Sequence, residues 1–417
     1  MYVMRWRNSV PGITARKILA LFCLQAVFIC CRSRDEIAEI TLEDGVEVVR
    51  NHVQPYRLKG APEALHLEEE LTIDTEREDL AKQGVTDIWG FDVNSLGEIF
   101  IFQPPMSSGD LVYKFDAKGR FLYSFVPKGQ GPGEVQWPIF HRISAADELP
   151  VLDMISRKLF LFDHNGKILQ ETPVPLEIRG SSMVLQLSNG NYLYRRVELD
   201  PRQKYPSLIL TYCLVSPEFQ NIKELDRVEI PHPLSALKIR FPFPLTVWGL
   251  ARDRIYIGNE QKGYEICVYD QDGNLVRKIR KEYAAIPFPE NKKRAVLKLL
   301  ESPQLSPIRE KLEFAEFSPP FQHLFCDDEG RLYVMTYETG ESPGEYLFDI
   351  FTSEGVSFAR TSCAVHLSAD LTAPGSPTDS WVTAKNGRFY AIREKSNGYK
   401  ELVGYRMIWE AEYSQFP

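Results

Sequence analysis

The chain has 417 residues, of which 44% are hydrophobic, 25% are charged and 12% are aromatic. This composition is typical of a globular protein, and the length suits two or three average domains or one large β fold. The formal net charge is −8, and it becomes −12 once the basic residues of 1–31 are left out. An acidic surface repels phosphate backbones, so we expect no nucleic-acid partner.

The first thirty-one residues have the pattern of a secretory leader. A basic stretch precedes the apolar run Ile18–Cys31, "ILALFCLQAVFICC". The run is short for a membrane span, which needs roughly 17–25 apolar residues. "FICC" weakly matches a lipid-attachment motif, which makes Cys30 and Cys31 the lipidation candidates. We therefore expect export to the periplasm or outer envelope, with a cleaved, lipid-modified or retained N-terminal segment.

A short N-terminal segment, 32–64, separates this leader from the main body, 65–417. It contains "ITLEDGVEVV", Ile40–Val49, which predicts a hairpin about Asp44 and Gly45. The next stretch, Leu65–Ile73, alternates apolar and polar residues and predicts a strand.

The main body contains a six-fold repeat. Each copy places an apolar, aromatic run after a short turn, usually one with glycine, and the copies begin 41 to 77 residues apart. The six runs are "GEIFIF" at Gly97, "LPVLDM" at Leu149, "GNYLYR" at Gly190, "DRIYIG" at Asp253, "GRLYVM" at Gly330 and "GRFYAI" at Gly387. A glycine that tolerates positive φ, followed by a buried strand, is what a tight β-turn requires. The spacing predicts an all-β fold, a six-bladed β-propeller with four strands in each blade.

Each run is followed by another predicted strand, and in five copies a polar turn then leads to a fourth. Asp116–Gly119 and Asp270–Gly273 have the aspartate and glycine of a type I turn. Asp270 and Asp272 could be read as calcium ligands, but the loop lacks the length and final glutamate of an EF-hand, so a plain hairpin is favoured. The sixth copy has no fourth strand before the chain ends, and we expect Leu65–Ile73 to supply it and close the ring.

A glycine-rich stretch, "KGQGPGEVQWP", follows the outer strand of blade one. A phosphate-binding loop would continue with Lys-Ser/Thr and a helix, and neither follows here. We interpret Gly129, Gly131, Pro132 and Gly133 as a structural loop that crosses from the rim to the channel.

These features together resemble the six-bladed propeller proteins of bacterial envelopes, relatives of the NHL-repeat propellers. The likeness rests on three stretches: Gly129–Val135, which is similar to a G-x-GPGEF loop, the hairpin Tyr113–Phe125 and the segment Asp44–Pro55. It covers residues 40–410, and it departs at Val135, where phenylalanine is usual, and in the insertion 289–320. The resemblance implies the fold and a lipoprotein character, but many members have no assigned activity.

The sequence offers no local motif for catalysis, a cofactor or a metal. It lacks H-E-x-x-H and G-x-S-x-G, and its histidines are scattered. Because propeller sites are assembled from distant blades, enzyme activity stays open. The cysteines Cys213, Cys267, Cys326 and Cys363 read as buried hydrophobes, although export would permit a disulfide.

Seven residues are candidates for ligand binding near the channel. They lie in inner strands, at their starts, or at a predicted loop from residue 195 to 206: Trp89, His141, Arg195, Arg196, Trp248, His323 and Trp381. Indoles stack on flat ligands and arginine binds carboxylates, although inner-strand indoles more often simply fill space between blades.

The longer connections share one face of the predicted propeller, and the insertion 289–320 between blades four and five lies on the same face. This insertion predicts two short helices, with Ser306 as an N-cap. Long loops on one face mark a working face, so we expect a small molecule, glycan or protein to bind there. The favoured function is a non-catalytic binding scaffold of the cell envelope. The alternative is a propeller hydrolase or lyase acting on a sugar, lactone or peptide.

Overall fold

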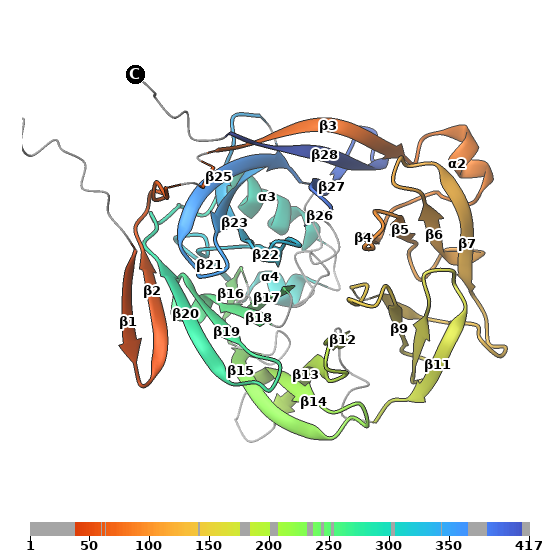
Figure 1. The fold of residues 1–417 in the computed structure, drawn as a ribbon, viewed down its shortest axis with the longest axis horizontal. Coiled ribbons are helices and arrows are strands. Elements are labelled where there is room, and N and C mark those ends of the chain that lie inside the picture. The colour runs from red at the N-terminus through yellow and green to blue at the C-terminus, as the bar shows by residue number, and fades with distance from the viewer. Residues whose placement is uncertain are drawn as a thin grey trace, which may run out of the picture. The chain divides into compact units, whose positions relative to one another are not determined.

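Each of the six repeated runs becomes the second of the four antiparallel strands that form one blade. The computed structural model describes residues 38–59, 61–62, 64–140, 142–175, 184–200, 207–231, 237–242, 246–251, 254–301, 305–342, 344–365 and 382–410. The sheets stand around a central channel as a six-bladed propeller (Figure 1), which confirms the expected fold.

The strands run from the channel to the rim in chain order, except in blade six, whose outermost strand precedes blade one in the sequence. Blades one and two consist of β4 (Gly90–Val93), β5 (Ile99–Phe102), β6 (Asp110–Phe115), β7 (Phe121–Pro127), β8 (Pro138–Phe140), β9 (Leu149–Asp153), β10 (Lys158–Phe162) and β11 (Ile168–Pro173). Blades three and four consist of β12 (Val184–Gln186), β13 (Tyr192–Asp200), β14 (Ser207–Val215), β15 (Asn221–Pro231), β17 (Thr246–Ala251), β18 (Arg254–Asn259), β19 (Glu265–Tyr269) and β20 (Leu275–Lys281). Blades five and six consist of β22 (His323–Cys326), β23 (Leu332–Thr339), β24 (Glu345–Phe351), β25 (Ser357–Ala364), β26 (Val382–Lys385), β27 (Arg388–Glu394), β28 (Lys400–Glu410) and β3 (Ala64–Asp74).

The strand β3 closes the ring, as the sequence predicts. It pairs antiparallel with β28 from Ala64 opposite Glu410 to Asp74 opposite Glu401. Blade six therefore joins the beginning of the propeller to its end, and Ile73 near the end of β3 is completely buried.

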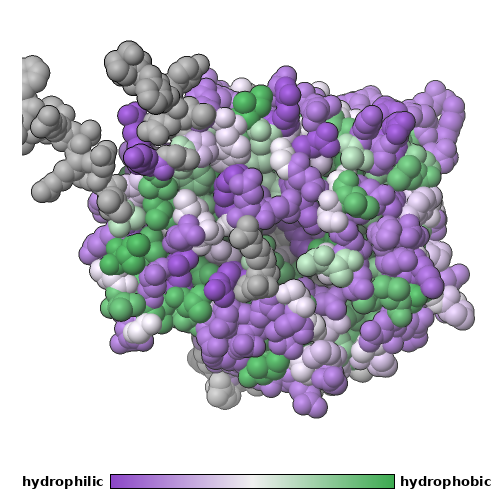
Figure 2. Space-filling view, viewed as in Figure 1, coloured by the Kyte–Doolittle hydropathy of each residue, from purple (hydrophilic) through white to green (hydrophobic). Residues whose placement is uncertain are grey.

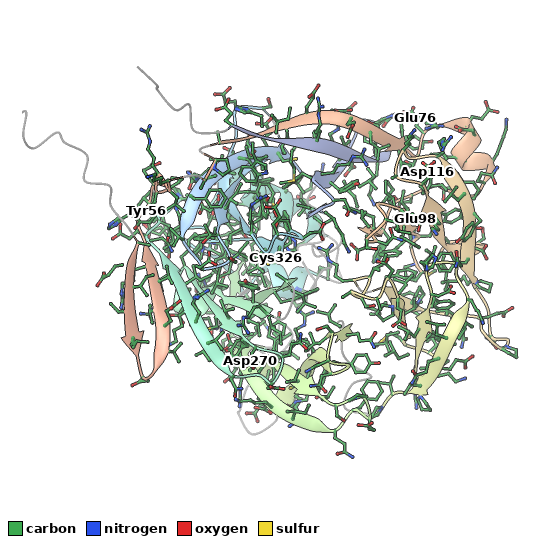
Figure 3. The ribbon with its side chains drawn as sticks, viewed as in Figure 1. Tyr56, Glu76, Glu98, Asp116, Asp270 and Cys326 are labelled. Carbon is green, nitrogen blue, oxygen red and sulfur yellow. The ribbon has the colours of Figure 1, made fainter. Side chains whose placement is uncertain are left out.

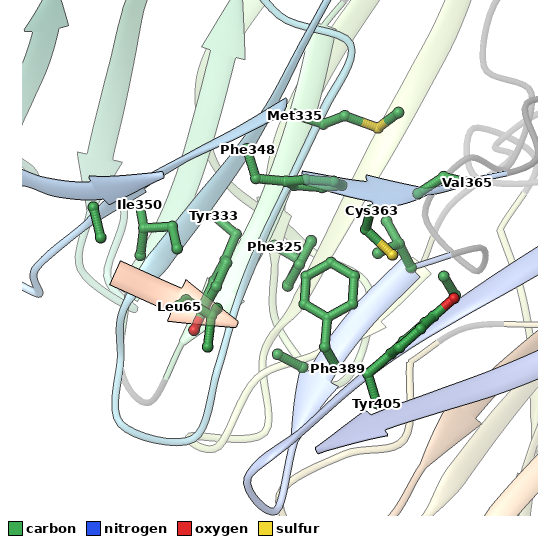
Figure 4. Packing of buried hydrophobic residues seen from close by; sticks show 14 of the residues in the cluster. Leu65, Phe325, Tyr333, Met335, Phe348, Ile350, Cys363, Val365, Phe389 and Tyr405 are labelled. Carbon is green, nitrogen blue, oxygen red and sulfur yellow. The ribbon is translucent and has the colours of Figure 1, made fainter. Parts of the chain in front are cut away.

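The core is divided among the interfaces between neighbouring blades. Each of six large apolar clusters draws its side chains from two adjacent blades. In β5, Ile99 and Ile101 pack toward blade six while Phe100 and Phe102 pack toward blade two. This explains why the repeated runs are apolar at every position, since both faces of these strands are buried. Figure 4 shows the cluster between blades five and six, in which Leu65 of the closing strand lies beside residues of blade five.

The aspartates of the outer turns hold those turns by hydrogen bonds. Oδ1 of Asp116 accepts the backbone N–H groups of Lys118 and Arg120, at 2.9 and 3.0 Å. Gly119 completes the turn at φ 74°. Asp270 makes the same pair of bonds to the N–H groups of Asp272 and Asn274, so this segment is a hairpin.

The N-terminal hairpin adds two strands to the rim of blade four. It consists of β1 (Glu39–Glu43) and β2 (Val46–Asn51), and β2 pairs parallel with β20. Asn51 then links this sheet to blade five, because its side chain donates to Gly355 O at 2.9 Å and accepts from Ser357 N at 2.8 Å.

The insertion between blades four and five forms a small capping module. Its elements are α3 (Glu290–Leu299), α4 (Ser306–Arg309) and β21 (Leu312–Phe314), which pairs parallel with β16 (Ile239–Phe241). Val296 and Leu300 pack with Phe241 and Phe288 in a cluster of their own. Nζ of Lys292 lies over two rings of blade five, 5.2 Å from the centroid of Tyr337 and 5.3 Å from that of Tyr346.

Two local expectations were wrong. Ser306 is the first residue of α4 and not its cap, because the residue before it, Leu305, takes the N-cap position without a side-chain hydrogen bond. The predicted loop from residue 195 is strand up to Asp200, since β13 continues its pairing with β14 to Ser207. The remaining short helices are α2 (Glu78–Lys82) and a 3₁₀ turn at Glu260–Lys262. In the part of the chain that the structure describes, no helix has the length and apolarity to cross a bilayer.

The closing strand generates a stability prediction. Replacing Ile73 with alanine should lower the free energy of unfolding by about 2–5 kcal/mol, because it removes fully buried methyl groups. His66→Ala on the exposed face of the same strand should change it by less than about 0.5 kcal/mol. Urea unfolding of both variants measures the two values, and equal effects would contradict the assigned role of β3.

Candidate ligand-binding channel

The inner strands surround a cavity of about 350 Å³ at the centre of the ring. All six blades contribute to its wall, among them Asp92, Arg142, Gln186, Trp248, His323 and Thr383. Turn residues such as Ser95, Asp147 and Asp328 also line it, so the cavity reaches the side of the short turns. Figure 2 shows the face on view hollowed near its centre, and Figure 3 places Cys326 of the wall close to the middle of the ring.

Arg142 ties three blades together across the channel. It belongs to blade two, and one of its terminal nitrogens lies 3.2 Å from Oδ1 of Asp92 in blade one. The other donates to the carbonyl oxygen of Val382 in blade six, at 3.3 Å. Asp92 also accepts the backbone N–H of Ile143 at 2.6 Å, and its side chain is 4% exposed. This buried pair fixes the relative positions of the inner strands.

His323 lies at the start of β22 and is 1% exposed. Its ring stacks on that of Phe325, with 5.9 Å between the centroids. Burial, together with the nearby charge of Arg142, lowers the pKa of His323 to about 3. The imidazole is therefore neutral at physiological pH and cannot act there as a proton donor from a charged state.

The turns at the channel rim are joined from blade to blade. Ser95 of blade one donates its backbone N–H to Asp147 of blade two at 2.8 Å. Asp328 of blade five accepts the N–H of Asn386 at 2.7 Å, and Asn386 in turn donates to the carbonyl of Asn94 at 2.9 Å. Polar side chains of the rim thus serve to lock neighbouring blades.

Asp327 is a largely buried acid of this rim, with 8% of its side chain exposed. Burial raises its pKa, although it accepts hydrogen bonds from Tyr333 at 3.0 Å and from the N–H of Arg331 at 2.9 Å. A guanidinium nitrogen of Arg331 also lies 3.1 Å from Oδ2. These contacts occupy both oxygens, so Asp327 holds its turn in place.

Two cations of the cavity wall stay available. Arg254 is exposed where β18 begins, and Lys385 lies at the end of β26. Neither side chain has an ion pair or hydrogen bond with any residue in the described ranges. Deeper in the channel, Oε1 of Gln186 is buried and accepts no hydrogen bond from that same part of the chain. The cavity therefore presents two cationic side chains to a ligand, and Gln186 has a buried acceptor in the wall behind them.

The predicted binding residues are dispersed. Trp248 lines the cavity, but it is 6% exposed and packs in the cluster between blades three and four. Trp89 is 41% exposed just before β4, outside the cavity wall. Arg195 is buried in β13, and Arg196 is paired with Glu198 and Glu224.

Two further candidates, His141 and Trp381, lie outside the described residues. So do parts of the long-loop face, 201–206 and 366–381, and binding there stays a prediction. Sequence reasoning missed five residues of the cavity wall: Asp92, Arg142, Gln186, Arg254 and Lys385. For Asp92, Arg142 and Lys385, the available signal was a charged residue inside an inner strand or within two residues of its end.

The glycine-rich loop is held by a hydrogen bond to the carboxylate of Glu134, a residue of the same loop. Glu134 accepts the N–H of Gly131 at 2.8 Å, and a Cβ on Gly129 would lie 1.9 Å from a Glu134 oxygen. Pro132 follows Gly131 in the chain, and Gly133 after it takes a positive φ of 77°. The loop packs inward through Val135, which is fully buried.

The described part of the chain contains neither a disulfide nor a cluster of metal ligands. Cys213, Cys267, Cys326 and Cys363 are free thiols there. Burial raises the pKa of Cys267 to about 11 and that of Cys363 to about 12, so their thiolates are disfavoured. No three acids, histidines or cysteines converge as a metal site within those ranges.

The Asp92–Arg142 pair generates a second prediction. Asp92→Ala should destabilise the protein by about 3 kcal/mol, because it leaves a largely buried guanidinium without its carboxylate. Adding Arg142→Met should restore a large part of this loss, since no charge is then unpaired. Chemical unfolding of both variants tests the pair, and a double variant less stable than Asp92→Ala would contradict it.

His323 generates a prediction about pH. Its folded pKa of about 3 lies below the ordinary value of 6.5, so the unfolded chain binds the proton first as pH falls. The stability contribution is complete above pH 6.5 and declines toward pH 3, by up to about 1.4 kcal/mol per pH unit. His323→Phe should flatten this part of the urea-midpoint profile, and an unchanged slope would show that His323 does not titrate as proposed.

Comparison with known families gives a partial match. A family model described as a 6-bladed beta-propeller, DUF5128, matches residues 93–227, which comprise most of blades one to three. A comparison with curated proteins found no significant match.

Solved structures of similar architecture have low sequence identity. A Bacteroides fragilis protein proposed to be exported is 12% identical with a TM-score of 0.49, and the match covers 87% of this chain and 99% of that one. A member of the duf4221 family from Bacteroides vulgatus is 10% identical with a TM-score of 0.45, over 84% and 99%. Virginiamycin B lyase from Staphylococcus aureus is 11% identical with a TM-score of 0.38, over 82% and 100%. The chain is thus similar, in part of its sequence, to a family of six-bladed propellers.

Proposed function

We propose that the protein is an exported binding protein that takes a small ligand into its central channel without chemically transforming it. The observation that carries this proposal is the state of the polar groups in the cavity wall. Asp92, Asp147 and Asp327 already accept hydrogen bonds from the protein, and His323 is neutral at physiological pH. Groups that are committed to structure are poorly suited to proton transfer, whereas Arg254 and Lys385 are available for recognition.

The export part of the proposal rests on the sequence. A basic stretch followed by Ile18–Cys31 is the pattern of a secretory leader, and Cys30 and Cys31 are the residues that a lipid would modify. The ligand site would then face the periplasm or the outer envelope.

A second candidate function is a hydrolase or lyase that acts on a sugar, lactone or peptide. It is favoured by one observation, the position of His323 in the wall beside Arg142. A neutral imidazole can accept a proton, but a pKa of about 3 makes it a weak base. We therefore place binding ahead of catalysis.

A matched pair of variants tests the channel as the binding site. Ala145 is exposed and lines the cavity, while its neighbour Ala146 is exposed and does not. Ala145→Trp should obstruct the cavity without removing a hydrogen-bond partner, and Ala146→Trp adds the same bulk outside it. Thermal unfolding would be followed with neutral sugars, sugar acids, lactones and short peptides. A ligand at roughly a hundredfold its Kd stabilises the fold by about 2.7 kcal/mol.

We expect this stabilisation in the wild type and in Ala146→Trp, but not in Ala145→Trp. Equal stabilisation of both variants would place the ligand elsewhere. Conversion of any of these compounds, detected by mass spectrometry and lost in Ala145→Trp, would favour the enzyme over the binding protein.

A further inference from the structure

Among the described residues, most acidic side chains of the cavity wall are paired with donors of the protein, whereas two of its cations are not. This difference indicates which kind of ligand the cavity would bind. Three of its acids are engaged by donors on the protein. Asp92 accepts from Arg142 and two backbone N–H groups, Asp147 accepts from the N–H and hydroxyl of Ser95, and Asp327 is held by Arg331 and Tyr333. A fourth acid, Asp328, accepts the N–H of Asn386 on one oxygen.

The cations of the wall differ from the acids in this respect. Arg142 is paired with Asp92, but Arg254 and Lys385 have no ion pair or hydrogen bond with a carboxylate in the described ranges, although the charge of Arg254 helps to lower the pKa of Asp270. They belong to blades four and six, so they approach the cavity from different sides of the ring. Each can donate charge-assisted hydrogen bonds to an anion, which are stronger than neutral ones.

The inner wall adds an acceptor. Oε1 of Gln186 is buried without a donor among the residues described, and an unsatisfied buried acceptor costs free energy. Oε1 has almost no accessible surface in the observed position, so a ligand hydroxyl would satisfy it once the side chain turns its amide toward the cavity. The volume of about 350 Å³ suits a single small molecule rather than a polymer chain.

We propose that the channel binds a small hydroxylated carboxylate of the sugar-acid class, with its carboxylate between Arg254 and Lys385 and a hydroxyl donating to Gln186. This inference rests on the proposed function and names the chemistry of its ligand. Neutral sugars lack the anion that the two cations recognise. Simple carboxylates without hydroxyl groups leave Gln186 unsatisfied.

The experiment compares D-glucuronate, D-galacturonate and D-gluconate with D-glucose by isothermal titration calorimetry on the chain without residues 1–31. At least one acid should bind more tightly than glucose. Lys385→Gln and Arg254→Gln should each weaken that binding by roughly tenfold to a hundredfold, the worth of a charged hydrogen bond. Added salt should also weaken it.

Lys118→Gln is the matched control, because Lys118 is an exposed turn lysine outside the cavity wall. It should leave the affinity unchanged. Gln186→Leu should weaken the binding of the sugar acids but not the binding of acetate.

Three outcomes would overturn the inference: no acid binds at millimolar concentration, an acid binds equally well to both cation variants, or glucose binds as tightly as the acids. If the Ala145→Trp variant still loses binding of some other compound, the channel remains the site and only the carboxylate assignment fails. If it loses none, the proposed function fails as well.

Discussion

The structure depends on the pairing of β3 with β28. A propeller has no single core, because each of its interfaces is made by two neighbouring blades. The ring holds only if the sixth blade contacts both the fifth and the first, and here one strand does both. Leu65 at the start of β3 packs with blade five, while Leu71 and Ile73 near its end pack with blade one. The first and last strands of the propeller are thereby joined without a covalent link.

The channel follows from this closure. Once six sheets are fixed in a ring, their inner strands must face one another, and side chains that would be unremarkable on separate sheets meet in one cavity. Arg142 illustrates the point, since its partners Asp92 and Val382 lie far from it in sequence and come from two other blades. The contacts that stabilise the ring also engage most of the acids around the cavity in hydrogen bonds or ion pairs. The groups left over are Arg254, Lys385, Gln186 and one oxygen of Asp328, and the first three are our candidates for recognition.

Much of the fold could be predicted from the sequence, because the repeated signal is local. Glycine and aspartate in the turns and doubly apolar strands are properties of short segments, and they identify the blades and the closing strand. The site could not be predicted in the same way. Trp248 reads as a ligand residue until its burial between two blades is known. Arg196 reads as available until Glu198 and Glu224, one of them on another strand, are seen beside it. Whether a polar side chain is free or engaged depends on neighbours that are distant in the chain.

The central claim is that the channel, and not the outer surface of the blades, is the place of recognition. A crystal structure of the protein grown with D-galacturonate tests it most directly. The account predicts electron density for the sugar acid in the cavity, with its carboxylate within hydrogen-bond distance of Arg254 and Lys385. Density for the ligand on the long-loop face or the outer strands, with the cavity filled only by water, would contradict it.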